Sequence, residues 1–221
     1  KPTLHMIKLS RNVLIANKES VICGWDLIKK TANKNNTKII PVDSEHFSIL
    51  ELIKNHKLNE IEKVFITASG GPFLNYSINK LKKVTPKQAL KHPKWKMGKK
   101  VSIDSSTLMN KILELIEAQK LFNIPLKKLD ILIHPDSLVH AVVKFKNGLT
   151  KLIFHETTML IPLANAILEK NFDINIFATK KRKLQTDHQK NIIFRKLNYK
   201  IFPIIKIKDR LLEHPSTPII I

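Results

Sequence analysis

Apolar runs that suit β-strands alternate with amphipathic stretches along the first part of the chain. Residues 13–16 and 38–42 are short apolar runs, and the residues between them, from 17 to 30, repeat apolar side chains at helical spacing. A strand, a helix and a second strand in this order are typical of a parallel sheet. Polar residues just after such a strand face the ligand crevice, and residues 43–46 (DSEH) occupy that position. The order of these runs therefore predicts an α/β fold.

A second set of runs predicts a mixed sheet packed with helices. Residues 64–68 suit a strand that leads directly into residues 69–72 (SGGP), which contain two of the five glycines. Adjacent glycines let the backbone adopt positive φ and approach an anion closely, but they also end strands in tight turns, and both interpretations stay open. Residues 138–145 and 150–154 flank a Lys-Asn-Gly turn, so we expect a hairpin there.

The stretch from residue 92 to residue 98 (HPKWKMG) places an aromatic side chain and a methionine among cations in a polar loop. Such apolar side chains are costly to expose unless they cover something. One interpretation is a lid in which Trp95 and Met97 close over a ligand. The other interpretation is that Trp95 packs into a neighbouring core.

A helix is predicted over residues 108–122, with residues 104–107 (DSST) supplying its N-cap. Four polar residues, Asn110, Lys111, Glu114 and Glu117, share one face of this helix. Such a face is usually solvated. Serines at a helix N-terminus, with an amide and a lysine one turn further on, are nevertheless what a phosphate site needs.

The charge balance is strongly basic. The chain has 39 Lys and Arg against 18 Asp and Glu, a net charge of +21, which raises the question of nucleic acid. Only four of these cations are arginine, and the lysines are spread along the whole chain. Because base-reading interfaces favour arginine and clustered cations, we expect no nucleic-acid partner. A phosphorylated small substrate is compatible with this charge.

Several classes of protein and site are disfavoured by what the sequence lacks. Cys23 is the single cysteine, so no internal disulfide is possible and we expect a cytoplasmic protein. No apolar run approaches the ~20 residues needed to cross a bilayer, so we expect no membrane partner. The sequence also lacks CxxC and HExxH zinc patterns, a P-loop and a GxGxxG turn.

Six stretches follow one another along the chain: residues 16–20 (ANKES), 42–46 (VDSEH), 68–73 (ASGGPF), 92–98 (HPKWKMG), 102–111 (SIDSSTLMNK) and 133–137 (IHPDS). Together they closely resemble the 1-deoxy-D-xylulose 5-phosphate reductoisomerase family, over roughly residues 12 to 165. The resemblance implies an oxidoreductase and isomerase of the non-mevalonate isoprenoid pathway. With Mg²⁺ or Mn²⁺, such an enzyme rearranges the carbon skeleton of a phosphorylated ketose. It then reduces the product with NADPH to 2-C-methyl-D-erythritol 4-phosphate.

The resemblance also implies roles for the residues at matching positions. Three carboxylates are implied to bind the cation, which agrees with the preference of Mg²⁺ and Mn²⁺ for hard oxygen ligands. The implied set comprises metal ligands Asp43, Glu45 and Glu114; catalytic residues Lys18, Glu45 and His92; substrate-binding residues Ser44, Ser69, His92, Ser105, Asn110 and Lys111; cofactor-binding residues Asn17, Lys18 and Glu19; and a lid that contains Trp95 and Met97.

The sequence departs from the family pattern in three places. Residues 1–42 resemble only the end of an NADPH-binding domain, without its Gly-rich turn, and the last residues resemble only the start of a C-terminal helical domain. Where the family shows Gly-x-Pro-Asp-Met-Arg, residues 155–160 are HETTML. The expected division is residues 1–42 as the end of the cofactor domain, 43–171 as the metal- and substrate-binding catalytic domain, 172–200 as a basic linker and 201–221 as the start of the helical domain.

We therefore expect a central fragment of such an enzyme that is not catalytically competent alone. Two alternatives stay open. In the first, the chain turns over once a separately supplied cofactor domain associates with it. In the second, the chain is a basic protein that derives from a degraded enzyme and now binds nucleic acid or another polyanion. A homodimer, as is common in the family, is also compatible with the sequence.

Overall fold

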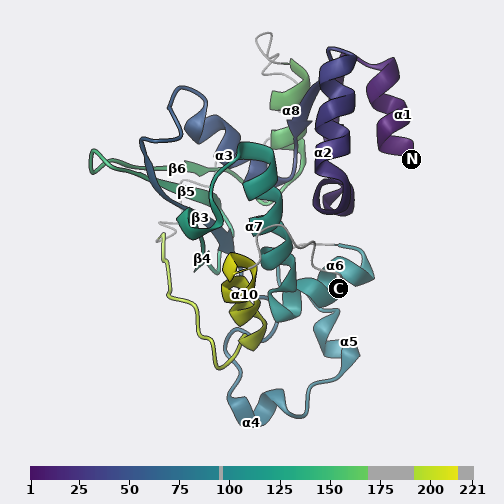
Figure 1. Cartoon of the computed structure of the whole chain (residues 1–221). Helices are drawn as coiled ribbons and strands as arrows, with labels where there is room; N and C mark the ends of the chain where they lie inside the picture. Colours follow the sequence, from purple (N-terminus) through teal and green to yellow (C-terminus); the bar gives the residue numbers. More distant parts are fainter. Residues whose placement is uncertain (95–96, 169–191, 214–221) are drawn as a thin grey trace, which may run out of the picture.

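The first part of the chain forms the expected strand-helix-strand unit. In the computed structural model, which describes residues 1–94, 97–168 and 192–213, β1 (Asn12–Ile15) and β2 (Lys38–Pro41) pair in parallel. The helix α2 (Lys18–Lys34) connects them and packs against α1 (Pro2–Leu9), beside which it stands in Figure 1. Its apolar stripe forms a small core with residues of α1 and β1, namely Ile7, Ile15, Val21, Ile28 and Ala32. The prediction of a parallel β-α-β unit is confirmed.

A four-stranded mixed sheet follows. Its order is β4-β3-β5-β6, in which β3 (Ile61–Ala68) pairs in parallel with β4 (Leu129–Ile133) and antiparallel with β5 (Val139–Phe145). The strands β5 and β6 (Thr150–Phe154) are antiparallel neighbours, as the Lys-Asn-Gly turn predicts. The helix α3 (Ser44–Ile53) connects the first unit to β3. The predicted α/β class, with a parallel pair and then a mixed sheet packed with helices, is confirmed.

The helix α7 (Met109–Phe122) packs against this sheet and against α2. Its apolar residues Ile112, Leu115 and Ile116 join the main core together with Ile66 of β3 and Ile131 of β4. Burial of one side chain of this size contributes roughly 1.5–3 kcal/mol, so the α7–sheet contact is a main source of stability. The polar side of the same helix is thereby directed away from the sheet core.

The predicted helix begins one residue later than expected, but residues 104–107 are not a simple N-cap segment. They end a separate helix, α6 (Lys99–Thr107), and Leu108 separates the two helices in a left-handed conformation with φ 65°. Thr107 Oγ1 still accepts a hydrogen bond of 3.3 Å from the N–H of Met109. Leu108 is 2% exposed and belongs to the main core, which accounts for a conformation that costs about 1–2 kcal/mol for a non-glycine residue. The sequence cannot show this break, because a Ser-Thr pair before an apolar stripe is also an ordinary N-cap signal.

The remaining elements are short. They are α4 (Ile78–Leu81), α5 (Pro86–Ala89), η1 (Leu126–Lys128), α8 (Leu160–Leu168), η2 (Pro203–Lys206) and α10 (Ile207–Glu213). Phe202, Ile205 and Leu211 pack into the same core as α7, so the last described residues are integrated with the sheet. The predicted domain boundaries stay predictions, and residues 169–191 and 214–221 lie outside the described residues.

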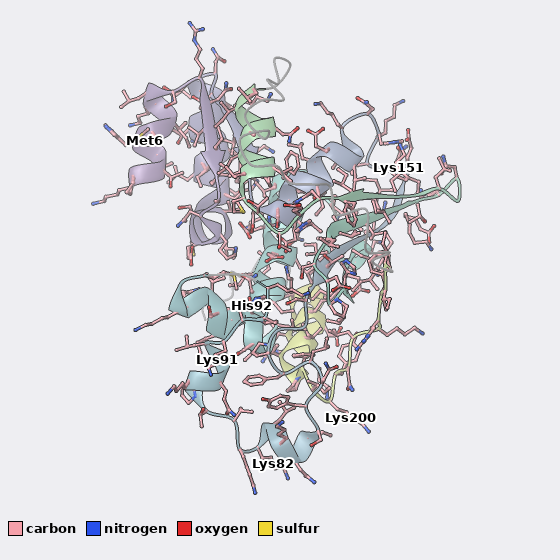
Figure 2. The ribbon with its side chains drawn as sticks, turned by 180° about the vertical axis from the view of Figure 1, so that it is seen from behind. Met6, Lys82, Lys91, His92, Lys151 and Lys200 are labelled. Atoms are coloured by element: carbon pink, nitrogen blue, oxygen red, sulfur yellow. The ribbon has the colours of Figure 1, made fainter. Side chains whose placement is uncertain are left out.

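Exposed lysines of the described residues are dispersed over the surface rather than gathered in one patch. Figure 2 shows Lys82 and Lys91 near α4 and α5, whereas Lys151 projects from β6 and Lys200 from the segment before η2. All four are exposed and lie apart from one another. This distribution agrees with the interpretation of a lysine-biased solvated surface. None of the helices in the described part of the chain is long and apolar enough to span a membrane.

One ion pair ties the last helix to the sheet. The Nζ atom of Lys208 in α10 lies 3.1 Å from Asp130 of β4, and Lys63 of β3 lies 3.2 Å from the same carboxylate. Burial alone would raise the pKa of Asp130, but Lys208, the backbone N–H of Ile131 and Lys63 together outweigh it and lower that pKa. An acid whose pKa is lowered on folding stabilises the fold above its ordinary pKa, and this contribution is lost as the pH falls.

We therefore expect Asp130→Asn to reduce the free energy of unfolding by about 0.5–1 kcal/mol at neutral pH and by almost nothing near pH 2. Urea unfolding of both proteins at the two pH values checks this. Glu62→Gln is the control, because the pair of Glu62 with Lys144 is about half exposed and should contribute less. An equal loss at both pH values would show that Asp130 acts through packing rather than charge.

Candidate active site

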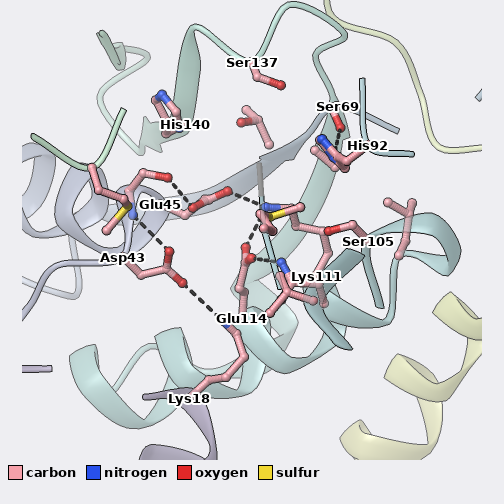
Figure 3. Close-up of a pocket in the computed structure, with 18 residues that line it drawn as sticks. Lys18, Asp43, Glu45, Ser69, His92, Ser105, Lys111, Glu114, Ser137 and His140 are labelled. Atoms are coloured by element: carbon pink, nitrogen blue, oxygen red, sulfur yellow. Dashed lines mark hydrogen bonds and ion pairs between the residues drawn. The ribbon is translucent and has the colours of Figure 1, made fainter. Parts of the chain in front are cut away.

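A cavity of about 200 Å³ lies where α2, α3, α6 and α7 meet the ends of the strands β3 and β5. Figure 3 shows its side chains, which come from segments that are far apart in the sequence. Lys18 comes from the first turn of α2, Asp43 and Glu45 from the start of α3, Ser69 from the turn after β3, and Glu114 from α7. The fold thus assembles one polar pocket from helices, strand ends and a turn that are distant in the sequence.

Three carboxylates converge in this cavity. Asp43 is the N-cap of α3, where its Oδ1 atom accepts a hydrogen bond of 3.1 Å from the backbone N–H of Ser44. Glu45 stands in the first turn of the same helix, and Glu114 reaches the cavity from the polar side of α7. One oxygen from each of the three lies within 4.8 Å of the others. The structure therefore brings together the three residues expected to bind a metal.

Two lysines compensate these carboxylates. The Nζ atom of Lys18 lies 3.2 Å from Asp43 Oδ2, and Nζ of Lys111 lies 2.8 Å from Glu114 Oε2 while it also donates to Glu45. Burial raises the pKa of Glu114 to about 8, and the neighbouring charge of Glu45 adds to this. Burial disfavours the charge of Lys111, but the carboxylates of Glu114 and Glu45 outweigh it and raise its pKa. The cavity thus concentrates acid groups that require a cation between them.

His46 contacts both the backbone of Glu114 and the side chain of Asp43. Its Nε2–H donates to the carbonyl oxygen of Glu114 over 3.0 Å, and its Nδ1 lies 3.7 Å from Asp43 and 4.0 Å from Glu117. Burial alone would lower the pKa of His46, but Glu117 and Asp43 outweigh it and raise the pKa to about 9. Asp43, His46 and Glu117 form a second group whose ligand atoms lie within 4.8 Å of one another. Sequence analysis noted His46 within a motif but assigned it no role.

The polar face of α7 is buried rather than solvated. Asn110, Lys111, Glu114 and Glu117 are between 1% and 8% exposed. Burial raises the pKa of Glu117 to about 7, and its Oε2 has no hydrogen-bond partner among the described residues. The expected pattern of one polar face is therefore present, and this face is directed at other buried polar groups instead of water.

A second polar patch lies beside the glycine turn. Gly70 and Gly71 have φ values of 85° and 62°, and the N–H of Gly71 donates to Ser69 Oγ over 3.1 Å. A Cβ atom at Gly71 would lie 2.8 Å from the carbonyl oxygen of Ser105, so glycine permits the close approach of α6 to this turn. The hydroxyl of Ser69 lies 3.2 Å from Nε2 of His92. The turn therefore brings Ser69, Ser105 and His92 to one end of the cavity.

Most of the expected site residues line this single cavity. The lining includes all six expected substrate-binding residues, the three expected metal ligands, Lys18 and Met97. These residues are Lys18, Asp43, Ser44, Glu45, Ser69, His92, Met97, Ser105, Asn110, Lys111 and Glu114. Burial and the charge of Lys111 lower the pKa of His92, which keeps its imidazole neutral. The placement of Met97 agrees with its expected position in a lid. Trp95 lies outside the described residues.

Two of the expected cofactor-binding residues lie elsewhere. Asn17 caps α2 by accepting a hydrogen bond of 2.7 Å from the N–H of Ser20, and Glu19 pairs with Lys100 of α6 over 3.4 Å. Neither residue is part of the cavity lining in the described part of the chain. Lys18, between them, is the one residue of this expected set that reaches the cavity.

Sequence analysis missed several lining residues, including Thr67, Ser137, His140 and Met159. Ser137 has φ 55° and is buried, but its motif carried no signal beyond a strand-ending turn. His140 lies inside β5, where its neighbours are apolar, so no pattern distinguishes it from a core residue. Met159 lies in the stretch that departs from the family pattern. Thr67 of β3 and His140 of β5 come together because the sheet places these two strands next to each other.

Comparison with known proteins agrees with this architecture. A family model described as the 1-deoxy-D-xylulose 5-phosphate reductoisomerase C-terminal domain matches residues 39–122. The 1-deoxy-D-xylulose 5-phosphate reductoisomerase of Pelagibacter ubique is 51% identical over 216 residues, which is 98% of this chain and 55% of the length of that relative. Over almost its whole length the chain is similar to proteins named 1-deoxy-D-xylulose 5-phosphate reductoisomerase. A reductoisomerase from a Wolbachia strain of Drosophila simulans is 42% identical over 98% of this chain and 54% of its own length.

Solved reductoisomerase structures share the fold. A structure of the enzyme in complex with NADPH, fosmidomycin and magnesium superposes with a TM-score of 0.83 and 33% identity, over 96% of this chain and 53% of the solved one. The Zymomonas mobilis enzyme in complex with NADPH gives a TM-score of 0.77 at 32% identity, over the same two shares. The chain thus spans about half the length of the reductoisomerases that it matches.

Proposed function

We propose that this chain carries the divalent-cation and substrate site of a 1-deoxy-D-xylulose 5-phosphate reductoisomerase and binds a phosphorylated ketose there. One observation supports the proposal most directly: Asp43, Glu45 and Glu114 converge in the same cavity as the serine, asparagine and lysine residues expected to hold a phosphate. The corresponding reaction rearranges the ketose skeleton and reduces the product. We assign to this chain the binding and orientation of the ketose for the rearrangement.

The donor set fits a hard divalent cation. Three carboxylate oxygens from Asp43, Glu45 and Glu114 lie close enough to share one ion, and Mg²⁺ and Mn²⁺ prefer such ligands. Lys111 places a positive charge between two of these carboxylates, which indicates where cationic charge is favoured. A cation bound there would polarise the carbonyl and hydroxyl oxygens of a ketose.

Different parts of the cavity offer different chemical groups to a ligand. Ser69 and Ser105 offer hydroxyl groups at one end of the cavity, while Asn110 and Lys111, which bind Glu114 in this structure, add an amide and a cation; we assign the phosphate to this set. Lys18, bound to Asp43, lies at the acidic end, where its ammonium group can hold a substrate oxygen. Met97 and Met159 add apolar surface that would limit the access of water to a bound ketose.

The described residues do not form a dinucleotide site of the usual kind. None of the five glycines lies between β1 and α2, where a Gly-rich turn would approach a pyrophosphate. Asn17 is engaged as a helix cap and Glu19 in an ion pair. We therefore assign the binding of NADPH, which solved reductoisomerases contain, to residues other than these and derive no reduction step from them.

The partners that we propose are the phosphorylated ketose and a second copy of the chain. Exposed apolar side chains at Phe154, Leu160 and Ile167, on β6 and the following helix, offer surface for such a homodimer. We also propose a cytoplasmic location, in agreement with an enzyme that acts on phosphorylated metabolites. The division of the chain into the four segments of the sequence analysis belongs to the same proposal.

Calorimetric titration with a phosphonate hydroxamate tests the acid and phosphate ends of the cavity together. We expect binding when Mn²⁺ is present and loss of binding when excess chelator removes it, because the hydroxamate oxygens require the cation. The control is a phosphonate of the same length without the hydroxamate, which should bind weakly and without metal dependence.

Absence of metal-dependent binding by the folded chain would refute the proposal. Duplex DNA, titrated in parallel at ~0.15 M salt, tests the alternative of a polyanion-binding protein, because binding through many lysines falls steeply with salt. DNA binding without ligand binding would favour that alternative.

A further inference from the structure

Two histidines stack on each other at the wall of the cavity. His140 of β5 lines the cavity, and His155 directly follows β6. Their ring centroids are 3.8 Å apart and the ring planes differ by 11°, and the residues are 2% and 6% exposed. His155 begins the stretch that departs from the family pattern, where the family has glycine. The stack is therefore a feature of this chain that the family resemblance does not supply.

Hydrogen bonds define the protonated nitrogen of each ring. Nδ1 of His155 lies 2.8 Å from the carbonyl oxygen of Glu156, and Nε2 of His140 lies 3.4 Å from the carbonyl oxygen of His155. Because a carbonyl oxygen only accepts, both nitrogens carry the hydrogen. Burial lowers the pKa of both histidines, that of His140 to about 4, so both rings are neutral near pH 7. His140 thus adopts the Nε2–H tautomer.

Backbone contacts hold His155 in this position. Its N–H donates to the carbonyl oxygen of Leu138 over 2.9 Å, which anchors the peptide whose oxygen faces His140. The edge of its ring meets Phe47 of α3, with centroids 6.2 Å apart and planes at 65°. The His155 ring therefore lies between the cavity histidine and the helix that carries Asp43 and Glu45.

The choice of histidine is costly for packing alone. Nε2 of His155 is buried and has no hydrogen-bond partner among the described residues. Such a group reduces stability, and a phenylalanine would fill similar space without it. His155→Phe therefore keeps a stacked ring beside His140 and removes the unpartnered nitrogen, which separates the effect of the ring from that of its nitrogen atoms.

We propose that His155 is a positioning residue for His140: its ring fixes the plane of the His140 imidazole, and its anchored carbonyl oxygen fixes the Nε2–H tautomer. As a result, the His140 ring faces a bound phosphorylated ketose in one orientation and always with the hydrogen on Nε2. The part of this inference that concerns the ligand rests on the proposed function. The part that concerns the orientation of His140 does not, because it holds in the free protein.

The test compares His155→Ala and His155→Phe with the unchanged chain. Imidazole ¹H–¹⁵N correlation spectra without ligand report the tautomer of His140. We expect a single Nε2–H form in the unchanged chain, a mixture of tautomers in His155→Ala, where the ring can rotate, and recovery of the single form in His155→Phe. With Mn²⁺ present, affinity for the phosphonate hydroxamate should fall about tenfold in His155→Ala and recover in His155→Phe.

His134→Ala is the matched control. His134 is 1% exposed, its Nδ1 donates to the carbonyl oxygen of Ile193 over 2.9 Å, and its Nε2 also lacks a partner, yet it does not line the cavity. This variant should lose stability but keep the His140 spectrum and the ligand affinity. An unchanged His140 tautomer in His155→Ala would overturn the inference. Failure of the unchanged chain to bind ligand would instead refute the proposed function and leave the spectroscopic test intact.

Discussion

Glu114→Gln is expected to abolish metal-dependent ligand binding while the fold is retained. Glu114 contributes one of the three convergent oxygens, and removal of its charge takes away a direct ligand. Changes in residues that only support a metal ligand cost 10–100-fold in affinity, so loss of the ligand itself should cost about a hundredfold or more. Titration of Mn²⁺, followed by its electron paramagnetic resonance signal, measures this loss.

The fold should tolerate this substitution. Burial raises the pKa of Glu114 to about 8, so near neutral pH the metal-free protein already favours the protonated acid. Glutamine resembles that protonated acid in size. Its oxygen can accept from Lys111, and its NH₂ group can donate to Oδ1 of Asn110 once that amide turns over, because this oxygen has no partner among the described residues. The midpoint of thermal unfolding without metal should therefore change by no more than about 3 °C.

Glu117→Gln is the matched variant, one turn along the same helix. Glu117 is also buried and acidic, but it belongs to the second cluster, with Asp43 and His46, and does not line the cavity. Mn²⁺ affinity should be retained in Glu117→Gln. If Glu117→Gln loses the ion and Glu114→Gln keeps it, the metal ligands are Asp43, His46 and Glu117, and the assignment made above is wrong.

The fold could be predicted largely because its signals are local. The apolar runs, the Lys-Asn-Gly turn and the helical spacing in α2 each depend on residues that are near in sequence, and the parallel and antiparallel pairings follow from their order. The break at Leu108 could not be predicted in this way. Its positive φ is held by packing in the core, which is a long-range property, whereas the local pattern favours one capped helix.

For the site, too, local features could be predicted from the sequence and long-range contacts could not. Motif resemblance was sufficient to select the residues that converge, because each lies at a strand end, in a glycine turn or on a polar helix face. It could not show that Lys111 also binds Glu45, since that contact joins α3 and α7 across 66 residues of sequence, whereas the contact of Lys111 with Glu114 lies within one turn of α7. His140 was missed for a related reason, because a buried histidine inside an apolar strand resembles any other core residue.

The contact of Lys111 with two acids leads to the second large effect. Lys111→Met is expected to destabilise the chain by about 3–5 kcal/mol, because its removal leaves the buried, charged carboxylate of Glu45 without compensation. For a chain of this size, that corresponds to a decrease of roughly 6–20 °C in the midpoint of thermal unfolding. Methionine keeps the length and most of the volume of the lysine side chain, so loss of packing contributes little. Thermal unfolding followed by circular dichroism measures the decrease.

Mg²⁺ or Mn²⁺ should restore much of this stability, because a cation held by Glu45 and Glu114 supplies the charge that Lys111 no longer provides. Affinity for a phosphorylated ligand should nevertheless remain low, since Lys111 would also pair with the phosphate. Lys144→Met is the control: Lys144 is about half exposed, lies 3.4 Å from Glu62, and should change stability by less than about 1 kcal/mol with no response to metal. A Lys111→Met protein as stable as the unchanged chain, or one that metal does not stabilise, would contradict the view that this lysine occupies the place of cationic charge among the three acids.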